Sequence, residues 1–170
     1  MDKIVFITGA SSGIGAGCAR KFASQGASLI LNARNVNKLS ALKEELEKQY
    51  GAKIYLLPFD VRDRKAATSA LESLPKEWQS IDLLVNNAGL VIGTDKEQEG
   101  SLDEWDIVID TNIKALLAMT RLIVPGMVER KRGHIINIGS IAGDAAYPGG
   151  SVYCATKAAV KALSDGLRID

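Results

Sequence analysis

The chain of 170 residues lacks several features that would indicate specialised classes of protein. It has only two cysteines, Cys18 and Cys154, which are far apart and fit no metal-ligand spacing, so we expect free thiols in a reducing compartment and no metal site. Acidic and basic residues nearly balance, with a formal net charge of +1, which argues against nucleic acid or an anionic membrane surface as the main partner. The single histidine, His134, is expected to have no catalytic role.

Long apolar runs are also missing. No stretch approaches the roughly 20 apolar residues needed to span a bilayer. The first residues lead directly into a strand-like segment, without the basic region, apolar stretch and cleavage site of a signal peptide, so we expect a cytoplasmic protein. The composition that remains is ordinary for a globular protein, with 46% hydrophobic and 24% charged residues, and the length suits a single domain over residues 1–170.

Short apolar runs alternate with helical patterns along the chain. The apolar runs cover residues 4–7, 29–31, 54–59, 83–85 and 134–138. The helical patterns cover residues from the glycine-rich turn to about 25, 36–50, 64–74, 102–130 and from 151 onward. Runs that are continuously apolar are typical of strands buried on both faces. The sequence therefore predicts an α/β fold, a Rossmann-type doubly wound parallel sheet with helices on both faces.

The helical pattern over residues 102–130 is apolar around most of its circumference. A helix of this kind is buried on more than one side. One side would face the sheet, and the other needs a partner helix, either from this chain or from another subunit. We favour a subunit contact and expect a homo-oligomer, either a dimer or a tetramer.

A glycine-rich turn with the sequence TGASSGIG, residues 8–15, joins the first apolar run to the first helical pattern. Glycines permit a tight turn and let a phosphate approach the backbone, while the helix N-terminus offers free N–H groups and a partial positive charge. Such a turn can also be purely structural. Its place between the first strand and the first helix favours a bound nucleotide.

The end of the second apolar run selects between the two nicotinamide dinucleotides. NAD sites place an acidic residue there to bind the ribose 2′-hydroxyl. Residues 31–35 read LNARN and contain no carboxylate, whereas the planar guanidinium of Arg34 is well shaped to pair with a 2′-phosphate. The alternative for Arg34 is a solvated arginine in a loop. We expect NADP as the cofactor.

Tyr153 and Lys157 are four residues apart in the last helical pattern and therefore share one face. A free phenol is a poor base at neutral pH, but an ammonium one helical turn away favours the phenolate, so Tyr153 can exchange a proton with an alcohol or alkoxide. Such a pair alone is also common on helix surfaces. Ser140, just beyond the fifth run, can hydrogen-bond a substrate oxygen or simply form a turn.

These motifs together resemble the short-chain dehydrogenase/reductase family, whose fingerprint is Thr-Gly-x3-Gly-x-Gly. The resemblance covers nearly the whole chain and implies an NADP-dependent oxidoreductase. It also implies a catalytic tetrad of Asn112, Ser140, Tyr153 and Lys157, in which Asn112 on the long helix holds a water. An asparagine inside a helix competes for backbone hydrogen bonds, so we expect a local distortion there, with surface exposure as the alternative.

The family resemblance further implies a set of cofactor contacts. Asp60 and Val61 match the pair beside the adenine, and residues 86–89 (NNAG) match the motif after the fourth strand, where structural and binding roles can coexist. The residues expected to bind the cofactor are Gly9, Ser11, Ser12, Gly13, Ile14, Gly15, Arg34, Asp60, Val61, Asn87, Ala88, Gly89, Tyr153 and Lys157.

Residues 125–139 and 141–152 look like one branch of the family, the NADP-dependent 3-hydroxy acid dehydrogenases, which act on serine, L-allo-threonine and related acids. Two alternatives stay open: another carbonyl substrate, such as a 3-ketoacyl thioester, a sugar or a steroid, and a nucleotide-binding fragment without turnover. Family members usually continue with two more strands and a loop over the substrate, whereas this sequence ends at Asp170. We therefore expect the C-terminal strands of the family to be missing, which would leave the sheet edge beside the fifth strand uncovered.

Overall fold

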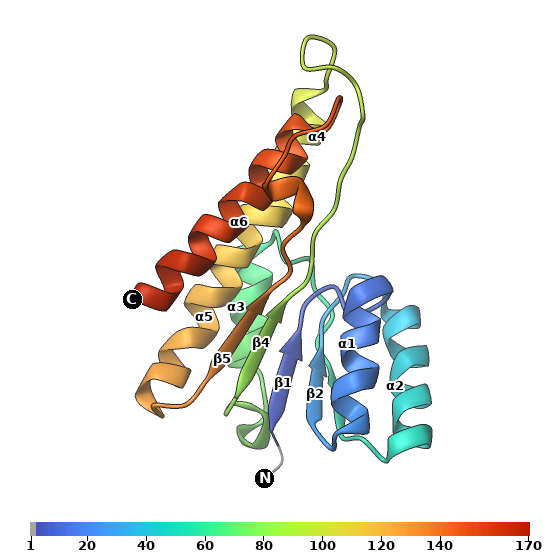
Figure 1. Ribbon diagram of the computed structural model, residues 1–170. Helices are drawn as coiled ribbons and strands as arrows, with labels where there is room; N and C mark the ends of the chain where they lie inside the picture. Colours follow the sequence, from blue (N-terminus) through green and yellow to red (C-terminus); the bar gives the residue numbers. More distant parts are fainter. Residues whose placement is uncertain (1–2) are drawn as a thin grey trace.

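A five-stranded parallel sheet forms the centre of the computed structural model, which describes residues 3–170 (Figure 1). Its strands are β1 (Ile4–Ile7), β2 (Ser28–Leu31), β3 (Ile54–Leu56), β4 (Leu83–Asn86) and β5 (His134–Asn137). Their order across the sheet is β3-β2-β1-β4-β5, and every neighbouring pair is parallel. The chain therefore has the Rossmann-type doubly wound sheet that the alternating pattern predicts.

Helices cover both faces of this sheet. They are α1 (Gly13–Ser24), α2 (Val36–Tyr50), α3 (Arg64–Glu72), α4 (Leu102–Ile109), α5 (Ala115–Glu129) and α6 (Ser151–Ile169), with short 3₁₀ turns at Lys76–Trp78 and Ile141–Gly143. In Figure 1, α1 and α2 lie on one side of the sheet, and α5 and α6 lie toward its β5 end. No helix within residues 3–170 combines the length and the apolar character that a membrane crossing requires.

The two faces of β1 explain why its sequence is continuously apolar. Val5 and Ile7 pack into the core layer between the sheet and helices α1 and α2. Ile4 and Phe6 belong to the opposite layer, which α3 and α5 cover. Because successive strand residues point to opposite faces, a strand covered on both sides has no position for a polar side chain.

Two predicted elements differ clearly from the structure, whereas the bounds of the others agree within two residues. The third strand ends at Leu56 instead of Phe59, because beyond Leu57 the side chain of Asn32 takes the place of the backbone ladder and donates hydrogen bonds to the Leu57 and Phe59 carbonyls. The prediction of a single helix over residues 102–130 is wrong. Helix α4 ends at Ile109, and a wider π-helical turn over Asp110–Lys114 precedes α5. The distortion expected at Asn112 is confirmed, and Asn112 is buried rather than exposed.

The apolar surface of α4 and α5 is covered only in part by this chain. Helix α5 packs on α3 and β4, and α4 packs on α6. Leu102, Leu117, Leu122 and Val128 are exposed in residues 3–170. Within residues 3–170, β5 pairs with β4 alone. Strand β5 therefore forms an edge of the sheet, as the sequence predicts.

Helix α2 offers a matched test of the core, because Leu46 is fully buried while Val36 on the same helix is 50% exposed. We predict that Leu46→Ala lowers the free energy of unfolding by about 3 kcal/mol, since the truncated side chain leaves a cavity. Val36→Ala should change it by less than about 0.5 kcal/mol. Urea unfolding followed by circular dichroism measures the free energy of unfolding of both variants. Equal decreases in the two variants would contradict this placement of α2.

Candidate functional site

A cleft of about 1100 Å³ lies at the carboxyl ends of the strands, the edge where open α/β sheets bind ligands. Its walls come from the segments that follow β1, β2, β3, β4 and β5 and from α6. Every residue expected to contact the cofactor lines this cleft except Gly15. Ser140 also lines it, whereas Asn112 does not. The fold thus brings together residues that are as far apart in sequence as Gly9 and Lys157.

The turn after β1 packs directly against the segment after β4. The side chain of Asn87 donates hydrogen bonds to the carbonyl oxygens of Thr8 and Gly9, each 3.0 Å long. A Cβ atom on Gly15 would stand only 2.5 Å from the Asn87 Nδ2 atom, and on Gly9, whose φ is +62°, it would meet the backbone of Ala88. Gly15 therefore serves close packing behind the cleft wall, which corrects its expected place at the cofactor surface.

The N-terminus of α1 opens into the cleft. Within residues 3–170, the N-cap Ser12 makes no side-chain capping bond, whereas α2, α3 and α4 are capped by Asn35, Asp63 and Ser101. The first backbone N–H groups of a helix have no partner inside the helix, and they carry a partial positive charge. Gly13 and Ile14 of this first turn line the cleft, so these donors are available to an anion such as a pyrophosphate.

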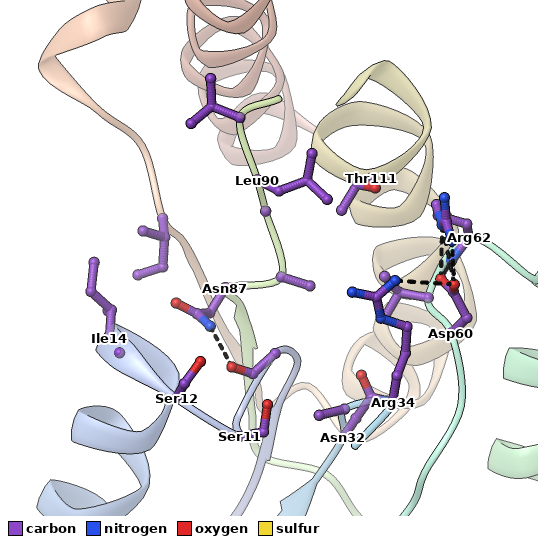
Figure 2. A pocket seen from close by; sticks show the side chains of 18 of the residues that line it. Ser11, Ser12, Ile14, Asn32, Arg34, Asp60, Arg62, Asn87, Leu90 and Thr111 are labelled. Carbon is purple, nitrogen blue, oxygen red and sulfur yellow. Dashed lines mark hydrogen bonds and ion pairs between the residues drawn. The ribbon is translucent and has the colours of Figure 1, made fainter. Parts of the chain in front are cut away.

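Two arginines and a carboxylate line the cleft beside the ends of β2 and β3. Figure 2 shows Arg34 and Arg62 directed at Asp60, across the cleft from Ser11, Ser12 and Ile14. The Arg62 Nη2 atom is 2.7 Å from Asp60 Oδ2, while the Arg34 Nη1 atom is 3.9 Å from the same oxygen. Hydrogen bonds from Arg62 hold the pKa of Asp60 below its ordinary value, so this carboxylate is ionised at neutral pH.

The opposite wall carries Ser140, Tyr153 and Lys157. Lys157 is buried, and its Nζ atom donates a 2.8 Å hydrogen bond to the Ile138 carbonyl and lies 5.8 Å from the centroid of the Tyr153 ring. Burial lowers the pKa of Lys157. The Ser140 Oγ atom accepts a bond from the backbone N–H of Ala142, which leaves its own proton for another acceptor.

Asn112 lies behind this wall and connects three segments. Its Nδ2 atom donates to the Leu90 carbonyl at 2.9 Å and to Thr156 Oγ1 at 3.0 Å, and its Oδ1 atom accepts from the Leu90 N–H. A Cβ atom on Gly89 would stand 3.3 Å from Asn112 Oδ1 and 3.6 Å from Lys157 Nζ, so the two side chains approach the same point. The π-helical turn thus joins the segment after β4 to α6.

Several residues that shape the cleft were not selected from the sequence. Asn32, Lys38 and Arg62 line the cleft, and Thr8 lies beneath it, where its hydroxyl accepts hydrogen bonds from the N–H groups of Asn87 and Ala88. Thr8 belongs to the TGASSGIG turn and Asn32 to the LNARN segment, so both had a sequence signal. Arg62, after β3, and Lys38, in α2, belong to no motif. Within residues 3–170 there is no cluster of three or more His, Cys, Asp or Glu residues suited to a metal.

Comparison with known proteins identifies relatives of the chain. A family model described as short chain dehydrogenase matches residues 3–170. The NADP-dependent 3-hydroxy acid dehydrogenase YdfG of Escherichia coli is 49% identical over 167 residues, which are 98% of this chain and 66% of that protein.

Solved structures of similar fold lead to the same family as the sequence relatives. Serine dehydrogenase from Escherichia coli has a TM-score of 0.93 and 49% identity, and the match covers 98% of this chain and 76% of that one. A closed form of serine dehydrogenase complexed with NADP+ has a TM-score of 0.91 and 48% identity, covering 98% of this chain and 66% of that one. The chain therefore spans slightly less than two thirds of the length of the curated relatives it matches, a share of 66%.

Two glycines of α1 test the close packing behind the cleft. A Cβ atom on Gly15 would overlap the Gly9 carbonyl, whereas on Gly17 it would meet no atom of residues 3–170 within 4 Å. We predict that Gly15→Ala lowers the free energy of unfolding by about 1–3 kcal/mol through overpacking. Gly17→Ala should raise it by up to about 1 kcal/mol, because alanine is the better helix former. Urea unfolding compares the two variants, and a neutral Gly15→Ala would refute this packing.

Proposed function

Because this chain belongs to the short-chain dehydrogenase family, we propose that its protein transfers hydride between NADP(H) and the hydroxyl or carbonyl carbon of a small 3-hydroxy acid, such as serine or L-allo-threonine. One observation carries the proposal: an open helix N-terminus, the exposed Arg34 and the pair Tyr153–Lys157 lie along one cleft. The names of the similar proteins support the cofactor and the substrate class. That residues 1–170 form a single cofactor-binding domain stays a prediction.

The residues at one end of the cleft fit the phosphates of NADP. The first turn of α1 offers unpaired N–H groups to the pyrophosphate, and the glycines of the preceding turn leave room for it. At the end of β2, the position that would bind a ribose 2′-hydroxyl carries no acid, and the exposed guanidinium of Arg34 suits a phosphate monoester. Ser11, Asp60 and Val61 would line the adenosine portion, and Ala88 and Gly89 the portion toward the nicotinamide.

The opposite end of the cleft supplies the proton chemistry. The nicotinamide, when bound, accepts or delivers the hydride. Tyr153 would take the hydroxyl proton during oxidation and return it during reduction, while the hydroxyl of Ser140 would hydrogen-bond the substrate oxygen. Lys157, close beneath the ring, would favour the phenolate of Tyr153. Asn112 would act as a positioning residue, because it holds the backbone of Leu90, the neighbour of Gly89, where an added Cβ atom would stand 3.6 Å from Lys157 Nζ.

We also propose that the protein is a cytoplasmic homo-oligomer, either a dimer or a tetramer. Two free cysteines, Cys18 and Cys154, are in keeping with a reducing compartment. The exposed apolar side chains on α4 and α5, Leu102 and Leu117 among them, provide a surface that a second subunit would cover. Sedimentation at several protein concentrations measures the assembly directly.

The substrate class is tested by following the absorbance of the reduced cofactor with L-serine, L-allo-threonine and a 3-ketoacyl thioester. The proposal requires turnover of the hydroxy acids with NADP+. Turnover of the thioester alone would assign the protein to another branch of the family. Retained NADP+ binding without any turnover would indicate a nucleotide-binding module.

For Tyr153→Phe we predict a loss of turnover of at least about 100-fold, because the acid/base proton is missing. The affinity for NADP+, measured by calorimetry, should stay nearly unchanged, since the ring that lines the cleft is retained. Val152→Ala, one residue earlier on α6, is the control for a general disturbance of that helix and should keep most of the turnover. Near-normal turnover in Tyr153→Phe would remove this residue from the mechanism.

For Arg34→Asp we predict that NADP+ binding weakens by at least about tenfold more than NAD+ binding, because a carboxylate repels the 2′-phosphate and can accept a bond from a 2′-hydroxyl. Calorimetric titration with each cofactor gives the ratio of the two dissociation constants. An unchanged ratio would exclude Arg34 from cofactor selection.

A further inference from the structure

The carboxylate of Asp60 is shared unequally between two arginines. Arg62 makes side-chain hydrogen bonds to both oxygens, at 3.1 Å from Nε and 2.7 Å from Nη2, and its backbone N–H adds a bond of 3.0 Å to Oδ1. Arg34 approaches Oδ2 only to 3.9 Å and forms no hydrogen bond with it in the part of the chain that the structure describes. The side chain of Arg34 is 67% exposed, against 32% for Arg62.

This arrangement matters for a ligand that carries a phosphate monoester. A carboxylate at this place repels a phosphate, and it also competes for the guanidinium that would bind one. With Arg62 present, the three side chains sum to one positive charge, which Arg34 presents at the cleft surface. Without Arg62 the pair Arg34–Asp60 sums to zero, and Asp60 would then be free to accept the hydrogen bonds of Arg34.

We propose that Arg62 determines the preference for a 2′-phosphorylated cofactor by neutralising Asp60 and thereby leaving Arg34 free to bind the phosphate. The inference rests on the proposed NADP site and adds to it a residue with a definite electrostatic role. Arg62 is a positioning residue in this account, because it acts through Asp60 and Arg34 and not through a contact of its own with the phosphate.

The test is a double-mutant comparison of Asp60 and Arg62, with calorimetric dissociation constants for NADP+ and NAD+ and no need for turnover. In Arg62→Met the preference for NADP+, taken as the ratio of the two constants, should fall about fivefold, as expected for one unit charge at several ångströms in a partly exposed site. In Asp60→Asn/Arg62→Met the preference should return to within about twofold of wild type, because no carboxylate is left to neutralise. Effects of Asp60 on adenine binding cancel in this ratio.

Adenosine 2′,5′-bisphosphate and AMP provide a second pair of probes, which differ only in the 2′-phosphate and do not depend on the nicotinamide end of the cleft. Arg20→Met is the matched control, since Arg20 forms a similar pair with Glu45, at 2.6 Å, and does not line the cleft. It removes the same charge and should leave the preference unchanged. Thermal unfolding checks that each variant is folded.

Two results would overturn the inference. The preference could be unchanged in Arg62→Met, or it could fall and fail to recover in the double variant, which would mean that Arg62 binds the phosphate itself. Failure of the wild-type protein to bind either cofactor is a different outcome, because it contradicts the proposed function and removes the inference with it.

Discussion

The close contact between the turn after β1 and the segment after β4 is the constraint on which the whole cleft depends. Glycine at positions 9 and 15 lets two pieces of backbone approach, and Asn87 and Thr8 saturate the polar groups that this approach buries. A buried N–H or carbonyl group without a partner costs about 1–3 kcal/mol, so these side chains are needed as much as the glycines. The contact brings the N-terminus of α1 and the segment that carries Ala88 and Gly89 into one cleft.

The second wall depends on a comparable arrangement around Asn112. The π-helical turn over Asp110–Lys114 interrupts the α4–α5 region, and the amide of Asn112 bonds both to the backbone of Leu90 and to Thr156 on α6. Such wide turns inside helices are rare and frequently occur at functional sites. Here the distortion joins the segment after β4 to the helix that carries Tyr153 and Lys157, so the two walls of the cleft are held relative to each other.

The positive charges of the cleft differ in burial between its two ends. The end of the cleft formed by α1 and the segments after β2 and β3 carries the partial charge of α1 and the arginines around Asp60, and these arginines lie near the solvent. The opposite end carries one buried cation, Lys157, whose pKa burial lowers and whose Nζ atom is hydrogen-bonded to the Ile138 carbonyl. An exposed charge attracts an anionic ligand, while a buried one acts mainly on its neighbour, the ring of Tyr153. In the proposed function, the same type of charge would serve ligand binding at one end of the cleft and proton transfer at the other.

Much of the fold and of the candidate site could be predicted from local sequence, because periodicity and turn chemistry act over short stretches of chain. The apolar runs located the five strands of the sheet, and every residue that the motifs assigned to cofactor binding lines the cleft, except Gly15. The close packing at Gly15 and Thr8, the pairing of Arg62 with Asp60, and the break in the long helix at Asn112 were decided only by tertiary structure. They depend on which strand ends meet at one edge of the sheet, and a contact such as that of Asn112 with Thr156 joins residues 44 positions apart, a separation that no local pattern records.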